Sequence, residues 1–450
     1  MARPRTSKAV LDRGDACCVV GAGSSGLTAA KNLIERGFAV DVIEREDELG
    51  GNWNFKKPNA RVYASTHTIS SKPFTQYPDF PMPDAFPDYP HHTQILSYLR
   101  SYARHFGLLD HTHFETSVER IEADEANNWL VTLRDASGSV HTRRYRNLVI
   151  ANGHNWHPKM PHYPGAFSGE HIHSAAYRDP SIFAGKRVLV IGAGNTGCDV
   201  AVEAADHARK SFHSTRRGYW YAPRYVFGKP ADQLYDLFLS ARLPLPVLRF
   251  CLETTARFTV GDVTRVGLAR PDHKFLETHP IINSQLVDYV GRGKISPRGD
   301  IERFDGQNVH FIDGRVEQID MIVSCTGYQI RFPFIDEHHL NWVDGRPRLY
   351  KNVFHPSYDN LFVIGLLQPD SGQFKLVHWQ SVAVAKYLQA RTLDPWRAAA
   401  FRREVVANLG EDLGAGVHYK ESTRHLVEVQ HMDYLRGLGR IIDSLTSPGA

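Results

Sequence analysis

The chain contains two stretches with the same order of apolar and polar positions. Residues 17–20 and 188–191 are short apolar runs, typical of strands that are buried on both faces. Each run stops at a G-x-G-x-x-G turn, and the residues after the turn place apolar side chains at helical spacing. This pattern predicts two strand–turn–helix units, each typical of the start of an α/β domain with a parallel sheet.

The glycines of both turns stand where a nucleotide phosphate would require them. In each turn the first glycine permits the tight bend, the second lets the backbone approach a pyrophosphate, and the third lets the helix pack against its strand. Free N–H groups at the helix N-terminus then bind the phosphates. The expected contacts are Gly21, Gly23, Ser25 and Gly26 in the first turn, and Gly192, Gly194, Asn195, Thr196 and Gly197 in the second.

The two units differ at the end of their second strand. Glu44 follows Gly26 by 18 residues, a position where a carboxylate accepts hydrogen bonds from ribose hydroxyls. Arg216 follows Gly197 by 19 residues, in a segment without an acidic side chain. Hydroxyls and guanidinium groups bind a 2′-phosphate, which a carboxylate would repel. The first unit therefore predicts an FAD site, and the second predicts an NADPH site formed with Ser214, Thr215, Arg216 and Arg217.

The chain is expected to cross twice between two doubly wound, Rossmann-like domains. One apolar strand ends in Asn152-Gly153 before a proline-rich linker, and another ends in a glycine turn at residues 325–328. We predict an FAD domain formed by residues 1–165 and 330–450, the latter including C-terminal helices. The NADPH domain is inserted as residues 166–329 and carries a helical segment near 230–282.

Composition restricts the classes of partner. The chain has 450 residues, and its 53 Lys and Arg against 49 Asp and Glu give a net charge of only +4, without the basic patch of a nucleic-acid-binding protein. No window approaches 18 uncharged apolar residues, so no membrane contact is expected. Five cysteines without a CxxC motif favour a reducing, cytoplasmic location, and no metal site is predicted. Small molecules are therefore the expected partners.

One apolar segment in the middle of the chain has two interpretations. Residues 234–260 are rich in leucine and phenylalanine, but several charged residues interrupt them. The segment therefore predicts packed or lid-like helices rather than a membrane span. Such helices would cover either a substrate entrance or a second copy of the chain in a homodimer.

Four motifs give the chain a resemblance to the flavin-containing monooxygenases. The segment FSGEHIHSAAY, residues 167–177, has the spacing FxGxxxHxxxY of that family's identifying sequence. ELGGNWNF resembles its GGxW flavin segment, SSKPFTQYPDFPMPDAFP its SK…DFPMP segment, and SCTGY its TGY linker. The resemblance marks Phe167, Gly169, His173, Tyr177, Thr326, Gly327 and Tyr328 as motif residues, and Gly51, Trp53, Val118 and Gln368 as further FAD contacts.

The resemblance implies an enzyme with FAD and NADPH that forms a C4a-hydroperoxyflavin from reduced flavin and O₂. One oxygen atom would then pass to a soft nucleophile, a sulfide or an amine. The cofactor performs this chemistry, which agrees with the lack of an evident nucleophile dyad. Two alternatives stay open: a Baeyer–Villiger monooxygenase acting on ketones, and an uncoupled NADPH oxidase that produces H₂O₂.

Two other classes fit the sequence less well. A pyridine-nucleotide disulfide reductase shares the plan of two dinucleotide domains but needs a reactive cysteine pair, which this chain lacks. A flavin-binding module without enzymatic activity would not need a phosphate-selective NADPH site. The sequence therefore favours a monooxygenase.

One position departs from the family's pattern. Before the SK pair the family resembles SNSSK, with an asparagine near the reactive face of the flavin, whereas THTISSK places Ile69 there. An isoleucine cannot hydrogen-bond a peroxide, so either His67 supplies the polar group or the enzyme releases H₂O₂. His67, Ile69 and Tyr177 are the candidate catalytic positions, and Tyr177 has a second interpretation as a residue that shapes the hinge.

Overall fold

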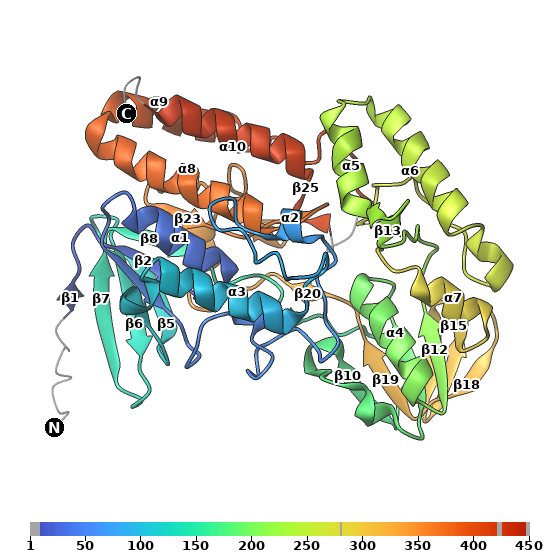
Figure 1. The fold of residues 1–450 in the computed structure, drawn as a ribbon. Helices are drawn as coiled ribbons and strands as arrows, with labels where there is room; N and C mark the ends of the chain where they lie inside the picture. Colours follow the sequence, from blue (N-terminus) through green and yellow to red (C-terminus); the bar gives the residue numbers. More distant parts are fainter. Residues whose placement is uncertain (1–9, 280, 421–424, 447–450) are drawn as a thin grey trace, which may run out of the picture.

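The computed structural model describes residues 10–279, 281–420 and 425–446. Both predicted strand–turn–helix units are present, and each opens a separate parallel sheet (Figure 1). The first unit consists of β2 (Cys17–Val20), α1 (Ser24–Ile34) and β3 (Val40–Ile43). The second consists of β11 (Arg187–Ile191), α4 (Asn195–His207) and β12 (Lys210–Ser214). The fold is therefore the predicted α/β class with two doubly wound units.

The first sheet has the strand order β23-β8-β2-β3-β4, and its strands are parallel. Its other members are β4 (Thr112–His113), β8 (Asn147–Ile150) and β23 (Leu361–Val363). Residues from both ends of the sequence thus lie in one sheet, as expected when another domain is inserted between them. Helices α3 (His92–His105) and α8 (Phe374–Leu393) contribute buried side chains to the same core as this sheet.

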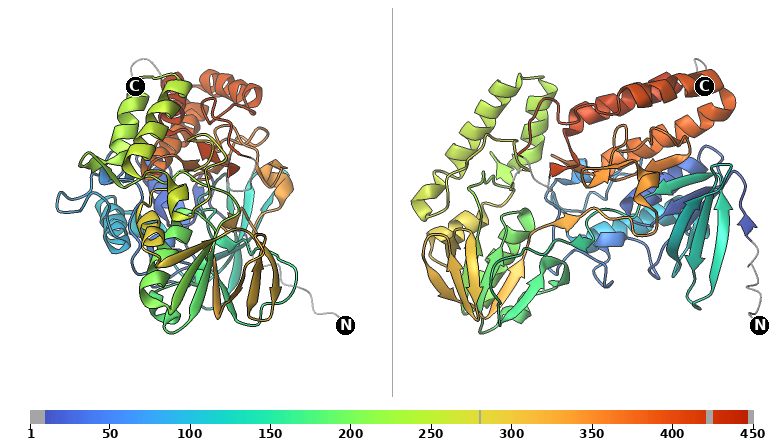
Figure 2. Two further views of the ribbon diagram at one scale, coloured as in Figure 1. Left: turned by 90° about the vertical axis from the view of Figure 1, so that its right-hand side faces the viewer. Right: turned by 180° about the vertical axis from the view of Figure 1, so that it is seen from behind.

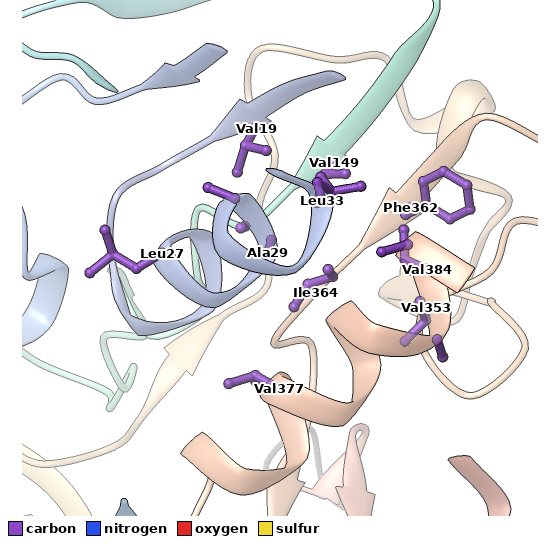
Figure 3. Packing of buried hydrophobic residues seen from close by; sticks show 14 of the residues in the cluster. Val19, Leu27, Ala29, Leu33, Val149, Val353, Phe362, Ile364, Val377 and Val384 are labelled. Carbon is purple, nitrogen blue, oxygen red and sulfur yellow. The ribbon is translucent and has the colours of Figure 1, made fainter. Parts of the chain in front are cut away.

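The largest core packs this sheet against helices α1 and α8. Figure 3 shows Val19 and Val149 of neighbouring strands, with Leu27 of α1 and Val377 of α8 in the same cluster. These four side chains are fully buried. A buried parallel sheet needs apolar residues on both faces, which explains the continuous apolar runs in its strands. The strand residues Cys17 and Cys18 are also buried, and all five cysteines are free thiols.

A smaller sheet with order β1-β7-β6-β5 flanks the first one. Its strands are β1 (Leu11–Asp12), β5 (Ser117–Ala123), β6 (Trp129–Arg134) and β7 (Val140–Tyr145). Strands β5, β6 and β7 form an antiparallel meander. Along β6, buried residues alternate with more exposed ones, so one face of the meander is buried and the other is not. The meander packs on the first sheet through the side chains of Trp129 and Tyr145.

The second parallel sheet has the order β10-β19-β11-β12-β15. Its remaining strands are β10 (Glu170–His173), β15 (Ile295–Arg298) and β19 (Met321–Ser324). Helix α7 (Gln285–Gly291) packs beside α4, and an antiparallel sheet follows with β16 (Ile301–Asp305), β17 (Asn308–Phe311) and β18 (Val316–Gln318).

The two connections between the sheets lie side by side. The chain enters the second sheet through β10 and leaves it through β19, and these strands are hydrogen-bonded neighbours. Between the sheets, β9 (His157–Pro158) pairs with β20 (Tyr328–Gln329) in antiparallel fashion. The predicted domain boundaries near residues 165 and 329 stay predictions. The paired strands β9 and β20, and β10 and β19, lie next to these boundaries in the sequence.

A helical hairpin extends from the second sheet toward the C-terminal helices (Figures 1 and 2). It contains α5 (Ala231–Ser240) and α6 (Leu245–Thr259), within the segment where helices were predicted. The end of the chain adds α9 (Pro395–Ala407), β25 (Glu428–Val429) and α10 (His431–Leu445). Within the described parts of the chain, no helix is both long enough and apolar enough to cross a membrane.

Candidate cofactor sites and substrate cavity

The first glycine turn has a backbone that only glycine fits well. Gly21 has φ +103°, and a Cβ atom there would lie 2.9 Å from the carbonyl oxygen of Ala151. A Cβ on Gly26 would lie 1.8 Å from the carbonyl oxygen of Gly21. Helix α1 therefore begins directly against its strand, with its free N–H groups at the carboxyl edge of the sheet.

Two other glycine segments approach this helix N-terminus. A Cβ on Gly51 would lie 3.2 Å from the Cα atom of Gly23, and the Gly50 N–H donates to the carbonyl of Ala22 at 3.0 Å. The segment with Trp53 therefore lies over the turn. A Cβ on Gly365 would lie 2.3 Å from Oγ of Ser25, which brings the segment after β23 to the same place. Together these backbones form a narrow cradle of the kind that a pyrophosphate needs.

The carboxylate of Glu44 reaches the same turn from the end of β3. It accepts hydrogen bonds from the Ala22 N–H at 2.7 Å and from the Glu46 N–H at 3.0 Å. Burial raises the pKa of Glu44, although these N–H groups act in the opposite direction. This is the position expected for a carboxylate that binds ribose hydroxyls. The backbone carbonyl of Glu44 accepts from Thr116, two residues before Val118 in β5.

Buried polar atoms near this edge also indicate a ligand. Oδ1 of Asn54, Oδ1 of Asn152 and Nε2 of His154 have no hydrogen-bond partner among the described residues. Burial lowers the pKa of His154 to about 4, although the Gly365 backbone favours its charged form. Unpartnered buried polar groups are costly, so a polar ligand that reaches them would stabilise the structure. The cradle, the Glu44 carboxylate and these atoms fit FAD.

The second glycine turn repeats the geometry of the first. Gly192 has φ +112°, and its Cβ would lie 2.4 Å from the carbonyl oxygen of Cys325. A Cβ on Gly197 would lie 1.9 Å from the carbonyl oxygen of Gly192. Gly194 caps helix α4, which begins at Asn195. The Asn195 side chain accepts a hydrogen bond from the Ile282 N–H at 2.8 Å, so it also fixes the segment after α6.

The four residues predicted to bind a 2′-phosphate have different surroundings. Ser214 is buried and its hydroxyl donates to the Gly299 carbonyl at 2.7 Å, whereas the Thr215 N–H donates to the carbonyl of Arg298. Arg217 lies 3.8 Å from the Asp272 carboxylate. Arg216 is exposed and forms no ion pair with the residues that the structure describes. Of the two arginines, Arg216 is therefore the freer one to bind a phosphate.

The residues of the FxGxxxHxxxY motif, residues 167–177, contact the second sheet and its helix α4. A Cβ on Gly169 would lie 2.5 Å from the carbonyl of Asp320, and the ring of Phe167 packs beside the same glycine. His173 is buried and accepts a hydrogen bond from the Ala175 N–H at 3.0 Å. Tyr177 is fully buried, and its hydroxyl donates to the Glu203 carboxylate in α4. These contacts favour a structural role for the motif.

The TGY linker connects the same region to the first sheet. Thr326 donates a hydrogen bond of 2.5 Å to the carbonyl of Lys159, and Gly327 has φ +80°. The ring of Tyr328 lies 5.3 Å from that of His173. The two linkers are therefore joined by hydrogen bonds and a ring contact.

A mostly apolar cavity lies between the helical hairpin and the first domain. Its lining includes Ile69, Leu234, Leu252, Phe275, Leu276 and Pro369. Ile69 comes from a loop before α3, Pro369 comes from the short strand β24 (Gln368–Pro369), and the others come from residues 234–276. A cavity of this composition, at the junction of two nucleotide-binding units, is the best candidate for the substrate site.

The three candidate catalytic positions do not lie together. Ile69 lines the cavity and is 37% exposed. His67 is exposed, its Nδ1 lies 2.8 Å from the Ser65 carbonyl, and its ring packs against His91 at 4.9 Å. Neither His67 nor Tyr177 is part of the described cavity lining. Their placement favours structural contacts over direct contact with a substrate.

A buried polar cluster ties the hairpin to the C-terminal helices beside the cavity. Tyr235 donates a 2.6 Å hydrogen bond to Asp370, and the His431 ring lies 2.9 Å from Asp370 and 3.1 Å from Asp236. Burial lowers the pKa of His431, but the hydrogen bonds and charges of the two carboxylates outweigh it, and the net pKa is raised. The predicted FAD contact Gln368 lies nearby and donates to Glu428 at 2.8 Å.

Sequence reasoning missed this cluster and the carboxylate of Asp232, which also lines the cavity. Isolated acids in an apolar, helical segment match no motif. The sequence offers one signal for this cluster, the charged residue Asp236 within the apolar run of residues 234–260, and that residue by itself indicates only that the run is not a membrane span.

The fold and the two sites define a flavoprotein that binds two dinucleotides. A model of the FMO-like family, described as flavin-binding monooxygenase-like, matches residues 14–446. The chain is 34% identical over 380 residues to flavin-containing monooxygenase 5 of Oryctolagus cuniculus, which covers 79% of this chain and 70% of that protein. The chain belongs to the flavin-containing monooxygenase family.

Solved structures support the same fold. The S-allyl-L-cysteine S-oxygenase from Allium sativum superposes with a TM-score of 0.67 at 21% identity, covering 96% of this chain and 89% of that one. An oxidized steroid monooxygenase bound to NADP gives a TM-score of 0.70 at 18% identity, covering 96% of this chain and 98% of that one. At these identities the likeness concerns the fold.

The chain is an FAD- and NADPH-dependent monooxygenase, and its partners are O₂ and a small-molecule substrate. When bound, FAD supplies the redox and oxygen-activating chemistry. The chain supplies two glycine turns at helix N-termini, the Glu44 carboxylate and a mostly apolar cavity.

Proposed function

We propose that this enzyme transfers one oxygen atom from O₂ to a soft nucleophile, a sulfide or an amine, with NADPH as the reductant. The cavity behind Ile69 is the observation that carries the proposal. A sulfur or an unprotonated nitrogen supplies its own electron pair. It therefore needs access and a dry pocket rather than an acid or base that activates it.

The lining of the cavity favours this reaction over ketone oxidation. Baeyer–Villiger chemistry uses an anionic oxygen nucleophile, which a nearby cation would stabilise. Among the described residues that line the cavity, none is a lysine or an arginine. Arg178, which follows the family motif, donates to the carbonyls of Ala175, Tyr177 and Pro58. The guanidinium of Arg178 therefore already has hydrogen-bond partners, and Arg178 is not part of the cavity lining.

The site residues have roles in this proposal. Gly21, Gly23, Gly26, Gly51 and Glu44 hold FAD, and the Gly192 turn with Arg216 holds NADPH. The S-oxygenase and the steroid monooxygenase share the fold with this chain and do not choose between the two reactions. Ile69 offers no hydrogen bond at its position, so part of the NADPH oxidation yields H₂O₂.

Product identification tests the proposal. The flavin-loaded enzyme would be incubated with NADPH, ¹⁸O₂ and a thioether, a tertiary amine and a ketone of the same carbon skeleton. A sulfoxide or an N-oxide carrying one ¹⁸O atom supports the proposal. An ester formed only from the ketone would replace it with Baeyer–Villiger activity. H₂O₂ without any oxygenated product would make the enzyme an NADPH oxidase.

A further inference from the structure

The apolar cavity contains one carboxylate that is only half engaged. Asp232 lies in the first turn of helix α5 and lines the cavity together with Ile69. Its Oδ2 accepts a 2.6 Å hydrogen bond from the Ser71 N–H. Its Oδ1 is buried and has no hydrogen-bond partner within the described part of the chain. One carboxylate oxygen is therefore held by the loop that contains Ser71, and the other is buried without a partner among the described residues.

Several neighbouring polar groups of the cavity already have partners, whereas Oγ of Ser371 and Nδ1 of His279 have no hydrogen-bond partner among the described residues. Asp370 accepts from Tyr235 and contacts the His431 ring, and the Tyr89 hydroxyl donates to the Arg224 carbonyl at 2.5 Å. His279 lies 3.5 Å from the Glu428 carboxylate. Asp232 has no ion pair with any residue that the structure describes. It is the acidic group of this lining whose charge is left without a counter-ion.

The electrostatics favour a positively charged ligand. Burial is the largest influence on the pKa of Asp232 and raises it, although the Ser71 N–H and backbone N–H groups of α5 act in the opposite direction. An ionised carboxylate in an apolar cavity is costly unless it is paired. A cation near Oδ1 would remove most of this cost, whereas a neutral apolar group would not.

We propose that Asp232 is a specificity-determining residue that selects substrates carrying a permanent or protonated ammonium group. The cation lies against Oδ1, and the apolar part of the substrate packs on side chains such as Leu252, Phe275 and Leu276. The reacting sulfur or nitrogen is a different atom, because an ammonium nitrogen has no free electron pair. This inference rests on the proposed oxygenation of soft nucleophiles and adds a charge requirement to it.

A binding experiment without turnover tests the subsite. Calorimetry of the oxidised, flavin-loaded enzyme would compare benzyltrimethylammonium with its neutral isostere neopentylbenzene. We expect the Asp232→Asn variant to bind the cation roughly 10- to 100-fold more weakly, because a close charge pair is lost, and to bind the isostere unchanged. The asparagine keeps an oxygen for the Ser71 N–H, so the loop stays in place.

A matched control removes an acid elsewhere in the inserted part. Asp262 is exposed, lies outside the cavity lining and accepts a hydrogen bond from the Thr264 N–H. Asp262→Asn changes the net charge by the same amount and should leave the binding of both probes unchanged. Equal cation binding by wild type and Asp232→Asn, or equal weakening by both variants, would overturn the subsite.

Turnover separates this inference from the proposed function. A thioether with a distant trimethylammonium group and a thioether with a tert-butyl group in its place would be compared by kcat/KM. The subsite is supported if wild type has a higher kcat/KM for the charged thioether and the Asp232→Asn variant loses this preference. If wild type oxygenates both thioethers equally, the subsite is wrong and the oxygenation stands. If it oxygenates neither but the binding difference persists, the proposed reaction is wrong and the cation subsite stands.

Discussion

The hydroxyl of Tyr235 in helix α5 donates a 2.6 Å hydrogen bond to the carboxylate of Asp370, 135 residues further along the chain. The first residue belongs to the inserted part, and the second follows a strand of the FAD-binding part. Asp370 and Tyr235 both line the cavity. The position of the helical hairpin over the cavity therefore depends on a buried polar contact as well as on apolar packing.

Replacing Tyr235 by phenylalanine should loosen this hairpin. The change removes a donor to a buried carboxylate and keeps the ring, so we expect a loss of about 1 to 2 kcal/mol in stability. Limited proteolysis of the flavin-loaded enzyme should cleave within residues 225–262 faster than in wild type. Tyr225→Phe is the control, because its hydroxyl contacts Asp88 at the surface. Identical digestion of the Tyr235→Phe variant and wild type would show that apolar packing alone holds the hairpin.

His431 should make the stability of this cluster depend on pH. The folded-state pKa of His431 is raised, so its contribution is complete below its unfolded pKa of about 6.5 and is lost as the pH rises through the folded value. The melting temperature of wild type should therefore fall over this window more than that of a His431→Gln variant. Parallel melting curves for both proteins between pH 6 and 9 would contradict the ionised state of His431.

Arg216→Ala should raise the KM for NADPH far more than the KM for NADH. Arg216 is exposed and free of an ion pair with the described residues, and a lost charge-assisted contact costs about 1.5 to 3 kcal/mol, or roughly 10- to 150-fold. Steady-state kinetics with both nucleotides measures the difference. Arg217→Ala is the matched control, since Arg217 already lies near Asp272. Equal weakening toward both nucleotides would refute the phosphate contact.

The two glycine turns and the helices that follow them could be predicted because their requirements are local. Gly21 and Glu44 lie within one strand–turn–helix unit, where a left-handed turn and a strand end fix their positions. The cavity depends on distant contacts: His431 meets Asp236 across 195 residues, and no periodicity encodes such a contact. The contact between His67 and His91 could not be predicted either, because the two residues come from different segments of the chain.

Two glycine substitutions should separate the two cofactors. Gly23→Val places a side chain in the cradle facing Gly51 and should give colourless protein without FAD. Gly194→Val should keep the yellow colour but lose rapid reduction by NADPH, because it blocks the second turn. Absorbance spectra and anaerobic stopped-flow mixing measure both effects. Gly439→Ala is the control, since its Cβ would meet no atom within 4 Å. A Gly194→Val protein purified without flavin would contradict one cofactor per turn.

Ile69→Asn should lower the yield of H₂O₂ per NADPH consumed. Ile69 lines the cavity but offers no hydrogen bond, and an amide that finds a polar partner contributes about 1 kcal/mol, or roughly fivefold in a competing rate. His67→Ala is the comparison, because His67 is exposed and packs on His91 outside the cavity lining. It should leave the yield unchanged. A peroxidase-coupled assay with NADPH and air, without substrate, measures the ratio. A sharp rise in His67→Ala with no change in Ile69→Asn would assign the polar role to His67 and contradict the role of Ile69.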